Sequence, residues 1–155
     1  MSRSAHFFDL GGTLLALDGD EIARDRTGRA TILPGVVAML SALAGTPVFV
    51  VTNQAGLADG TLTRAQFDGF CAQLSTATRG VVTEYAVCAH RRDAGCACRK
   101  PQPGLVLRLA AVHHIDLAAS VMVGDTETDQ RLAAAAGVGR FAWAAGYFGT
   151  PGPAR

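Results

Sequence analysis

Short apolar runs alternate along the chain with longer segments in which apolar residues recur at helical spacing. The runs are nearly continuous stretches of β-branched and aromatic residues, without the alternation of a strand that has one face in water. Such runs are typical of strands buried on both faces of a sheet. They predict five buried strands, at residues 6–8, 48–51, 85–87, 121–123 and 140–143.

The segments between these strands have the length and the bounding residues of helices. Gly45 and Pro47 end the first, Thr63 suits the N-cap of the second, and Gly137 closes the last. Alternation of strand and helix predicts right-handed crossovers in a three-layer, Rossmann-like α/β fold, with a parallel sheet covered by helices on both faces. We expect one domain over residues 1–155. The predicted helices are residues 36–44, 64–78, 103–114 and 126–136.

Residues 14–33 fit neither pattern. Turn signals at Asp18-Gly19-Asp20 and Thr27-Gly28-Arg29 indicate a loop-like segment. We interpret it as a hairpin flap that covers the functional end of the sheet.

Composition and charge argue against a nucleic-acid-binding or membrane protein. The 155 residues are 49% hydrophobic and 17% charged, with a formal net charge of +1. This near-neutral balance gives no electrostatic argument for a nucleic-acid or membrane partner. No apolar run reaches the roughly 18 residues that span a bilayer, and residues 1–6 have no signal-peptide pattern. We therefore expect a cytoplasmic protein that is not bound to membranes, and a monomer.

Polar residues stand where the predicted strands end. Asp9 follows the first strand, Thr52 and Asn53 follow the second, and Asp125 follows the fourth. In parallel sheets ligands bind beyond the carboxyl ends of the strands, so these side chains are candidates for one site. A carboxylate such as Asp9 can attack phosphorus, and a hydroxyl such as that of Thr52 can hold phosphoryl oxygens. Taken singly, each is equally explained as a turn or capping residue.

Two further groups of charges lie beside predicted helix starts. Arg99 and Lys100 precede the third helix, where both the cations and the helix dipole favour an anion. Lys100 is the single lysine beside 13 arginines, which reflects either a GC-rich genome or a position that requires an ammonium group. Asp125, supported by Asp129, is suited to Mg²⁺, which prefers oxygen ligands. The alternatives are solvated charges and compensation of the helix dipole.

Three of the four cysteines cluster with a histidine. Cys88 and His90 are followed after a short loop by Cys96 and Cys98, a set of three thiolates and one imidazole. Four such ligands suit a tetrahedral structural Zn²⁺ site with no open position. The alternative is a group of free thiols. Cys71, within a predicted helix, reads as a buried small apolar residue.

Taken in order, these motifs resemble those of the haloacid dehalogenase-like (HAD) superfamily. They comprise Asp9-Leu10-Gly11-Gly12-Thr13, Thr52, Lys100 before a helix, and Gly124-Asp125 with Asp129 four residues on, and the likeness spans about Phe7 to Gly149. Val51-Thr52-Asn53-Gln54-Ala55-Gly56 and Arg99-Lys100-Pro101 narrow the likeness to subfamily IIIA, in its heptose-bisphosphate phosphatase and histidinol phosphatase branch, and so does the zinc set. The 38 residues between Thr13 and Thr52 leave little room for a cap, so a capless enzyme is expected.

The resemblance implies a reaction. Asp9 would form an aspartyl-phosphate that water then hydrolyses, with Mg²⁺ held by Asp9, the backbone carbonyl of Gly11 and Asp125. Thr52 and Lys100 would neutralise the charge of the transferring phosphoryl group, and Asn53 and Arg99 would help to bind the substrate. A phosphorylated sugar or a similar small metabolite is the expected substrate. An open site also admits a phosphorylated polynucleotide end.

Position 11 departs from this pattern. Phosphatases of the superfamily carry a second Asp there, which protonates the leaving group and then activates water, whereas this chain has Gly11. General acid–base catalysis contributes about 10²–10⁴-fold. One explanation is a slow or specialised phosphatase, and another is a catalytically disabled phosphate-binding relative, natural or produced by an introduced Asp→Gly change. Dehalogenase or phosphonatase chemistry is a third explanation that fits less well, because both rely on a cap and the second on a further lysine.

Overall fold

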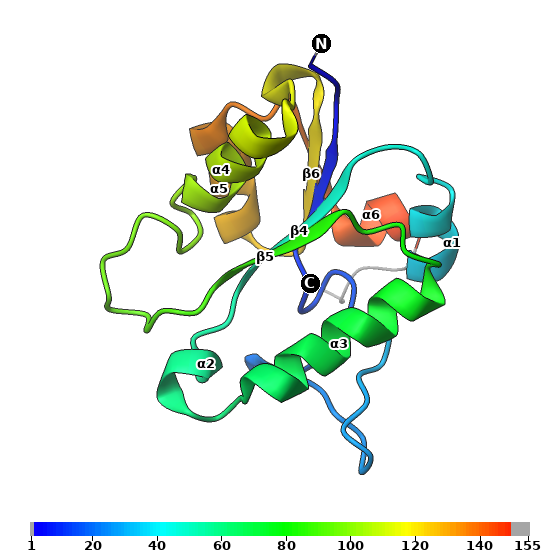
Figure 1. Ribbon diagram of the computed structural model, residues 1–155, viewed down its shortest axis with the longest axis vertical. Helices are drawn as coiled ribbons and strands as arrows, with labels where there is room; N and C mark the ends of the chain where they lie inside the picture. The colour runs from blue at the N-terminus through cyan, green and yellow to red at the C-terminus, as the bar shows by residue number, and fades with distance from the viewer. Residues whose placement is uncertain (1, 150–155) are drawn as a thin grey trace.

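The computed structural model describes residues 2–149. Its centre is a sheet of five parallel strands in the order β5-β4-β1-β6-β7 (Figure 1). This order places β1 between β4 and β6, so that the three ends predicted to carry chemistry are neighbours. The strands are β1 His6–Phe8, β4 Val48–Asn53, β5 Glu84–Cys88, β6 Val121–Gly124 and β7 Arg140–Trp143.

Helices cover both faces of the sheet, which confirms the predicted three-layer fold (Figure 1). Successive strand residues point to opposite faces, so Phe8 packs with one set of helices and Phe7 with the other. Both rings are fully buried, and each contributes about 1.5–3 kcal/mol through loss of apolar surface from water. The first face carries α1 Val36–Ser41, α3 Arg64–Ala77 and α6 Ala144–Phe148, and the second carries α4 Gly104–His113 and α5 Glu127–Ala136.

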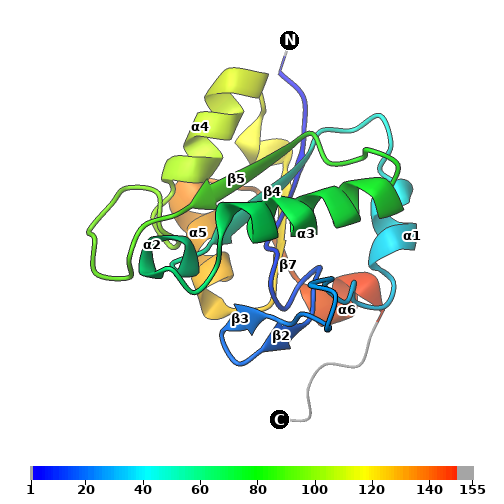
Figure 2. The ribbon, with the colours of Figure 1, turned by 60° about the horizontal axis from the view of Figure 1, so that its bottom comes forward.

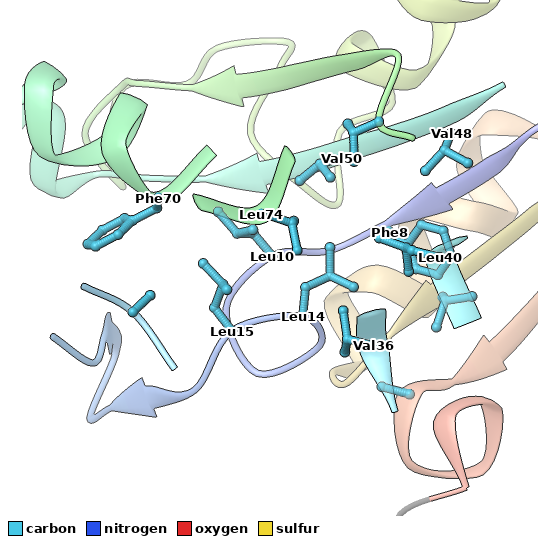
Figure 3. Close-up of a cluster of buried hydrophobic side chains, with 14 of the residues drawn as sticks. Phe8, Leu10, Leu14, Leu15, Val36, Leu40, Val48, Val50, Phe70 and Leu74 are labelled. Carbon is cyan, nitrogen blue, oxygen red and sulfur yellow. The ribbon is translucent and has the colours of Figure 1, made fainter. Parts of the chain in front are cut away.

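The core of the first face continues into the segment that follows β1. Figure 3 shows Phe8 and Val50 of the sheet facing Leu40 of α1 and Leu74 of α3, with Leu14 beside them. Leu10, Leu14 and Leu15 are all fully buried in this cluster. The residues around Asp9 are therefore fixed by apolar contacts on both sides of it in the sequence.

The predicted flap is confirmed as a small hairpin. β2 Leu17–Asp18 and β3 Glu21–Ile22 pair antiparallel, with Leu17 opposite Ile22. Figure 2 shows the hairpin at the end of the sheet at which the strands finish, opposite the N-terminus. The hairpin thus lies at the carboxyl ends of the strands, where the candidate site residues stand.

Helix ends largely follow the capping residues. Thr63 and Thr126 each close a capping box, with Gln66 and Asp129 as partners, and Gly137 caps the end of α5 in the left-handed region. The predicted end of the first helix at residue 44 is wrong. α1 ends at Ser41, because the chain beyond it tightens into i→i+3 bonds, such as Leu43 N–H to the carbonyl oxygen of Leu40.

Three short elements were not predicted from the sequence. They are α2 Gly56–Asp59, a 3₁₀ turn at Leu117–Ala119, and α6. Segments of three to five residues are too short to display a helical period. Within residues 2–149 no helix is long and apolar enough to cross a membrane.

Two glycine-to-alanine substitutions should change the stability of the fold in opposite directions, one through backbone freedom and the other through a steric clash. Gly69 lies exposed in α3 with open space around its Cα, so Gly69→Ala should stabilise the fold by about 0.5–1 kcal/mol. A Cβ at Gly139 would collide with the backbone carbonyl oxygen of Ala118, so Gly139→Ala should destabilise it by about 1–3 kcal/mol. Urea unfolding of the three proteins measures both changes, and the same sign for the two variants would contradict this account of the packing.

Candidate active site

A buried lysine is the centre of the site. The Lys100 ammonium donates hydrogen bonds to Oδ1 of Asp9 at 2.6 Å, to Oδ1 of Asp129 at 2.9 Å and to the Val51 carbonyl oxygen at 2.9 Å. Lys100 is only 6% exposed. All three donor positions of the ammonium are therefore used, and the side chain has a single orientation.

Each of these side chains is positioned by the element that carries it. Asp9 continues β1 into the edge of the sheet, with its N–H donating to the Val123 carbonyl oxygen at 3.1 Å. Asp129 stands in the first turn of α5, where its Oδ2 also accepts from the Thr126 hydroxyl at 3.0 Å. The helix start thus fixes one carboxylate and the central strand fixes the other.

Asn53 holds the backbone of Lys100 from β4. Its Oδ1 accepts from the Lys100 N–H at 2.9 Å, and its Nδ2 donates to the Lys100 carbonyl oxygen at 3.2 Å. The sequence assigned Asn53 to substrate binding. In the structure its amide is hydrogen-bonded to the Lys100 backbone, and Asn53 also lines the cavity that contains Asp9.

Burial and ion pairing shift the three titrating groups. Burial raises the pKa of Asp9 to about 6, against the opposing attraction of the Lys100 ammonium. Burial also raises the pKa of Asp129, again opposed by Lys100. Burial lowers the pKa of Lys100, but the charges of Asp9 and Asp129 outweigh it and the net shift is upward.

Asp125 completes a group of three carboxylates. One oxygen each of Asp9, Asp125 and Asp129 lie within 4.8 Å of one another. The Thr13 hydroxyl donates to Oδ1 of Asp125 at 3.1 Å. Asp125 approaches this closely because residue 12 is glycine, and a Cβ there would overlap with its carboxylate. Oxygen ligands in this number and spacing suit a hard divalent cation.

Thr52, Gly11 and Arg99 line a cavity of about 240 Å³ in common with Asp9 and Lys100. Thr52 is 2% exposed, and its hydroxyl accepts from Nε2 of Gln54 at 2.9 Å. Nη1 of Arg99 is buried and has no hydrogen-bond partner among residues 2–149. The structure thus brings together all the residues that the sequence proposed for the phosphoryl site.

Other residues of this cavity had no signal in the sequence motifs. Arg92 and Asp20 reach it from two different loops and lie 3.8 Å apart, Nη2 to Oδ2. An adjoining cavity of about 290 Å³ shares Arg92 and Arg99 and adds Arg24. These positions become neighbours only through the fold, because the flap and the cysteine loop are distant in sequence.

The flap also covers residue 11. A Cβ built on Gly11 would lie 2.6 Å from Cδ2 of Leu17 and 3.7 Å from Cγ1 of Ile22. The space that a side chain of residue 11 would enter is therefore occupied by apolar atoms of the hairpin.

The cysteine cluster is assembled as the sequence predicted. Ligand atoms of Cys88, His90, Cys96 and Cys98 lie within 4.8 Å of one another. The distance from Cys98 Sγ is 3.2 Å to Cys88 Sγ and 3.1 Å to His90 Nδ1, and Cys88 Sγ lies 3.6 Å from Cys96 Sγ. Zn–S bonds of about 2.3 Å give a tetrahedral edge of roughly 3.8 Å, so the set fits Zn²⁺ after small shifts.

Comparisons with known proteins identify the fold and the family. A family model described as HAD-hydrolase-like matches residues 97–149. The D,D-heptose 1,7-bisphosphate phosphatase of Bordetella bronchiseptica, solved with magnesium and phosphate, superposes with a TM-score of 0.78 at 31% identity, covering 88% of this chain and 78% of that one. A HAD-like phosphatase structure from Mesorhizobium loti gives a TM-score of 0.71 at 27% identity, covering 91% of this chain and 70% of that one.

Curated relatives agree. The D-glycero-β-D-manno-heptose-1,7-bisphosphate 7-phosphatase of Escherichia coli K12 is 41% identical over 105 residues, which are 61% of this chain and 55% of that protein. The Bordetella bronchiseptica enzyme is 38% identical over 110 residues, 68% of this chain and 62% of that protein. The matched part of the chain thus spans less than two thirds of these relatives' length.

The chain belongs to the HAD-like hydrolase family. Within it, the chain is similar to the heptose-bisphosphate phosphatases.

The cation site should depend on the missing Cβ of residue 12. Gly12 has φ +82°, and Gly28, in an open turn, has φ +83° with nothing near its Cα. Alanine at either position costs about 1–2 kcal/mol of backbone strain. We expect Mg²⁺ to raise the melting temperature of the native protein. Only Gly12→Ala displaces Asp125, so it alone should lose this rise. Equal Mg²⁺ responses of the two variants would argue against a cation at Asp125.

Removal of zinc should destabilise the native protein. A chelator should lower its melting temperature, and Cys98→Ser should lower it without chelator and abolish the chelator response. Cys71→Ser is the control, because Cys71 is half-buried in α3, away from the cluster, where burial raises the pKa of its thiol to about 12. A chelator response that survives in Cys98→Ser would exclude this cluster as its source.

Proposed function

We propose that the chain is a phosphohydrolase that transfers a phosphoryl group to Asp9 and then to water, in the presence of Mg²⁺. The observation that carries the proposal is the buried arrangement of Asp9, Lys100 and Asp129, with Asp125 beside them, at the carboxyl ends of β1 and β6. Family membership supports it.

The roles of the side chains follow from their placement. Asp9 presents a carboxylate to the cavity and is the nucleophile. The Lys100 ammonium and the Thr52 hydroxyl lie on the same cavity and stabilise negative charge on the phosphoryl oxygens. Mg²⁺, held by Asp9, the Gly11 carbonyl and Asp125, would neutralise further charge when bound, as the magnesium and phosphate in the Bordetella bronchiseptica structure support.

The zinc set has a structural role in this proposal. Cys98 immediately precedes Arg99 and Lys100, so closing the loop on one Zn²⁺ limits the freedom of the backbone that delivers both cations. Four protein ligands leave no open position for substrate.

The relatives' names make a phosphorylated sugar the first substrate to test. Arg24, Arg92 and Arg99 line the cavity adjoining Asp9, and Nη1 of Arg99 is free of partners among the described residues. Guanidinium groups in such a place favour a second anionic group on the substrate. We propose a cytoplasmic location, with no membrane partner.

A second candidate function rests on Gly11. Without a carboxylate at this position, the chain can bind phosphate and Mg²⁺ and yet turn over so slowly that binding is its main activity. A phosphorylated polynucleotide end is a further candidate substrate.

Hydrolysis of p-nitrophenyl phosphate with and without Mg²⁺ tests the proposal. Asp9→Asn should lower kcat by at least about 10³-fold, since it removes the attacking oxygen while keeping the shape. The matched control is Asp68→Asn, whose carboxylate is exposed on α3 and pairs with Arg64 at 3.1 Å. A panel of sugar monophosphates, sugar bisphosphates and 5′-phosphorylated oligonucleotides then ranks substrates. Equal rates for Asp9→Asn and native protein would refute the nucleophile.

A further inference from the structure

We propose that the site accepts phosphoryl groups only from donors whose leaving group departs without being protonated: acyl phosphates, phosphoanhydrides and aryl phosphates. Alkyl phosphates would be poor substrates, and the primary phosphate esters of sugars are among them. The inference rests on the proposed function and narrows its substrate class. It comes from the apolar filling of the space beside Asp9, at residue 11.

The hairpin makes this space apolar. Leu17 and Ile22 are paired across the hairpin, and both approach the position of a Cβ on Gly11. Ile22 is buried, whereas Leu17 remains 42% exposed and lines the cavity together with Asp9. A leaving group that emerges past residue 11 therefore meets hydrocarbon in place of an acid.

No other group lining this cavity is placed to supply the proton, within the described part of the chain. The Lys100 ammonium donates a hydrogen bond to Asp129, and Asp9 is the attacking group. Arg92 and Arg99 do not release protons in proteins. Asp20, at the tip of the hairpin, has a side chain that is 88% exposed, and its Oδ2 pairs with the Arg92 guanidinium at 3.8 Å.

The transfer step balances without an acid. An Asp9 carboxylate oxygen forms a bond to phosphorus, and the bond from phosphorus to the leaving oxygen breaks with its electron pair on that oxygen. The leaving group departs as a carboxylate, a phosphate or a phenolate, each stable as an anion in water. An alkoxide is not, so an alkyl ester loses the contribution of general acid catalysis, about 10²–10⁴-fold.

Hydrolysis of the aspartyl-phosphate lacks a general base, because residue 11 has no carboxylate to take the proton of the attacking water. Water attacks the phosphorus of the aspartyl-phosphate, the bond to the Asp9 oxygen breaks, and the water proton passes to solvent. Because no side chain takes this proton, the phosphorylated Asp9 should accumulate while an activated donor is present. This intermediate gives a readout independent of turnover.

The test compares kcat/KM for acetyl phosphate, p-nitrophenyl phosphate, phenyl phosphate and glycerol 3-phosphate. Gly11→Asp combined with Leu17→Ala restores a carboxylate and removes the side chain that would block it. This double variant should raise glycerol 3-phosphate turnover by about 10²–10⁴-fold and change acetyl phosphate turnover by less than about tenfold. Leu17→Ala alone, which opens the space without an acid, should give no such selective gain.

Of two further variants, Val112→Asp is a control and Asp20→Asn tests a residue of the cavity itself. Val112→Asp adds a carboxylate at an exposed site on α4, which covers the opposite face of the sheet from the hairpin's core contacts, and should leave the ratio of rates unchanged. Asp20→Asn tests the remaining carboxylate of the flap and should also leave the ratio unchanged. Melting temperatures confirm that each variant is folded, and intact mass after acid quenching reports phosphorylated Asp9.

The outcomes separate this inference from the proposed function. Native turnover of glycerol 3-phosphate within tenfold of p-nitrophenyl phosphate would overturn the inference and leave the phosphohydrolase intact. So would a fall in alkyl phosphate turnover in Asp20→Asn, which would identify Asp20 as the acid. No turnover and no phosphorylation of Asp9 with any donor would overturn both. A steep preference for activated donors that the double variant removes supports the inference.

Discussion

The Lys100 ammonium is buried between two carboxylates, and most of the site is arranged around that fact. Removing these charges from water costs several kcal/mol for each ion, and the cost is recovered only when the geometry satisfies every donor. Here the ammonium makes three hydrogen bonds, to Asp9, Asp129 and a strand carbonyl. Loss of one partner would leave a buried charge uncompensated. Both the stability of the fold and the chemistry of the site therefore require that the Lys100 ammonium keeps its partners.

The same arrangement explains why the site favours a cation. Three carboxylates, of Asp9, Asp125 and Asp129, face one ammonium, which leaves a formal charge of −2 when all are ionised. Such an excess in a largely dry site is stabilised by a divalent ion. Burial is the largest cause that raises the pKa of Asp9 and of Asp129, and a neighbouring carboxylate raises each further, which a bound cation would oppose.

Much of this arrangement could be predicted from the sequence, because it depends on short-range patterns. Asp9 directly follows β1, and parallel strands bring their carboxyl ends to one edge, so Asp9, Thr52 and Asp125 were expected together. Thr63 and Thr126 marked two helix starts correctly. The end of α1 was misplaced, since Ala42 to Ala44 continue the apolar pattern while the backbone tightens.

Tertiary contacts account for what the sequence could not predict. Asn53 stands in the motif like a substrate ligand, and only the fold brings the Lys100 backbone to its amide. The approach of Arg92 to Asp20 joins two loops with no common pattern. Leu17 is an ordinary apolar residue of a turn-rich segment, and nothing in its neighbours indicates that it contacts Gly11.

Leu17 and residue 11 compete for one volume, and this links the flap to the chemistry of the site. With glycine at position 11, side-chain atoms of Leu17 and Ile22 occupy the space that a side chain of residue 11 would enter. With a side chain there, Cδ2 of Leu17 would have to shift, so the present position of the Leu17 side chain and a side chain at residue 11 are alternatives.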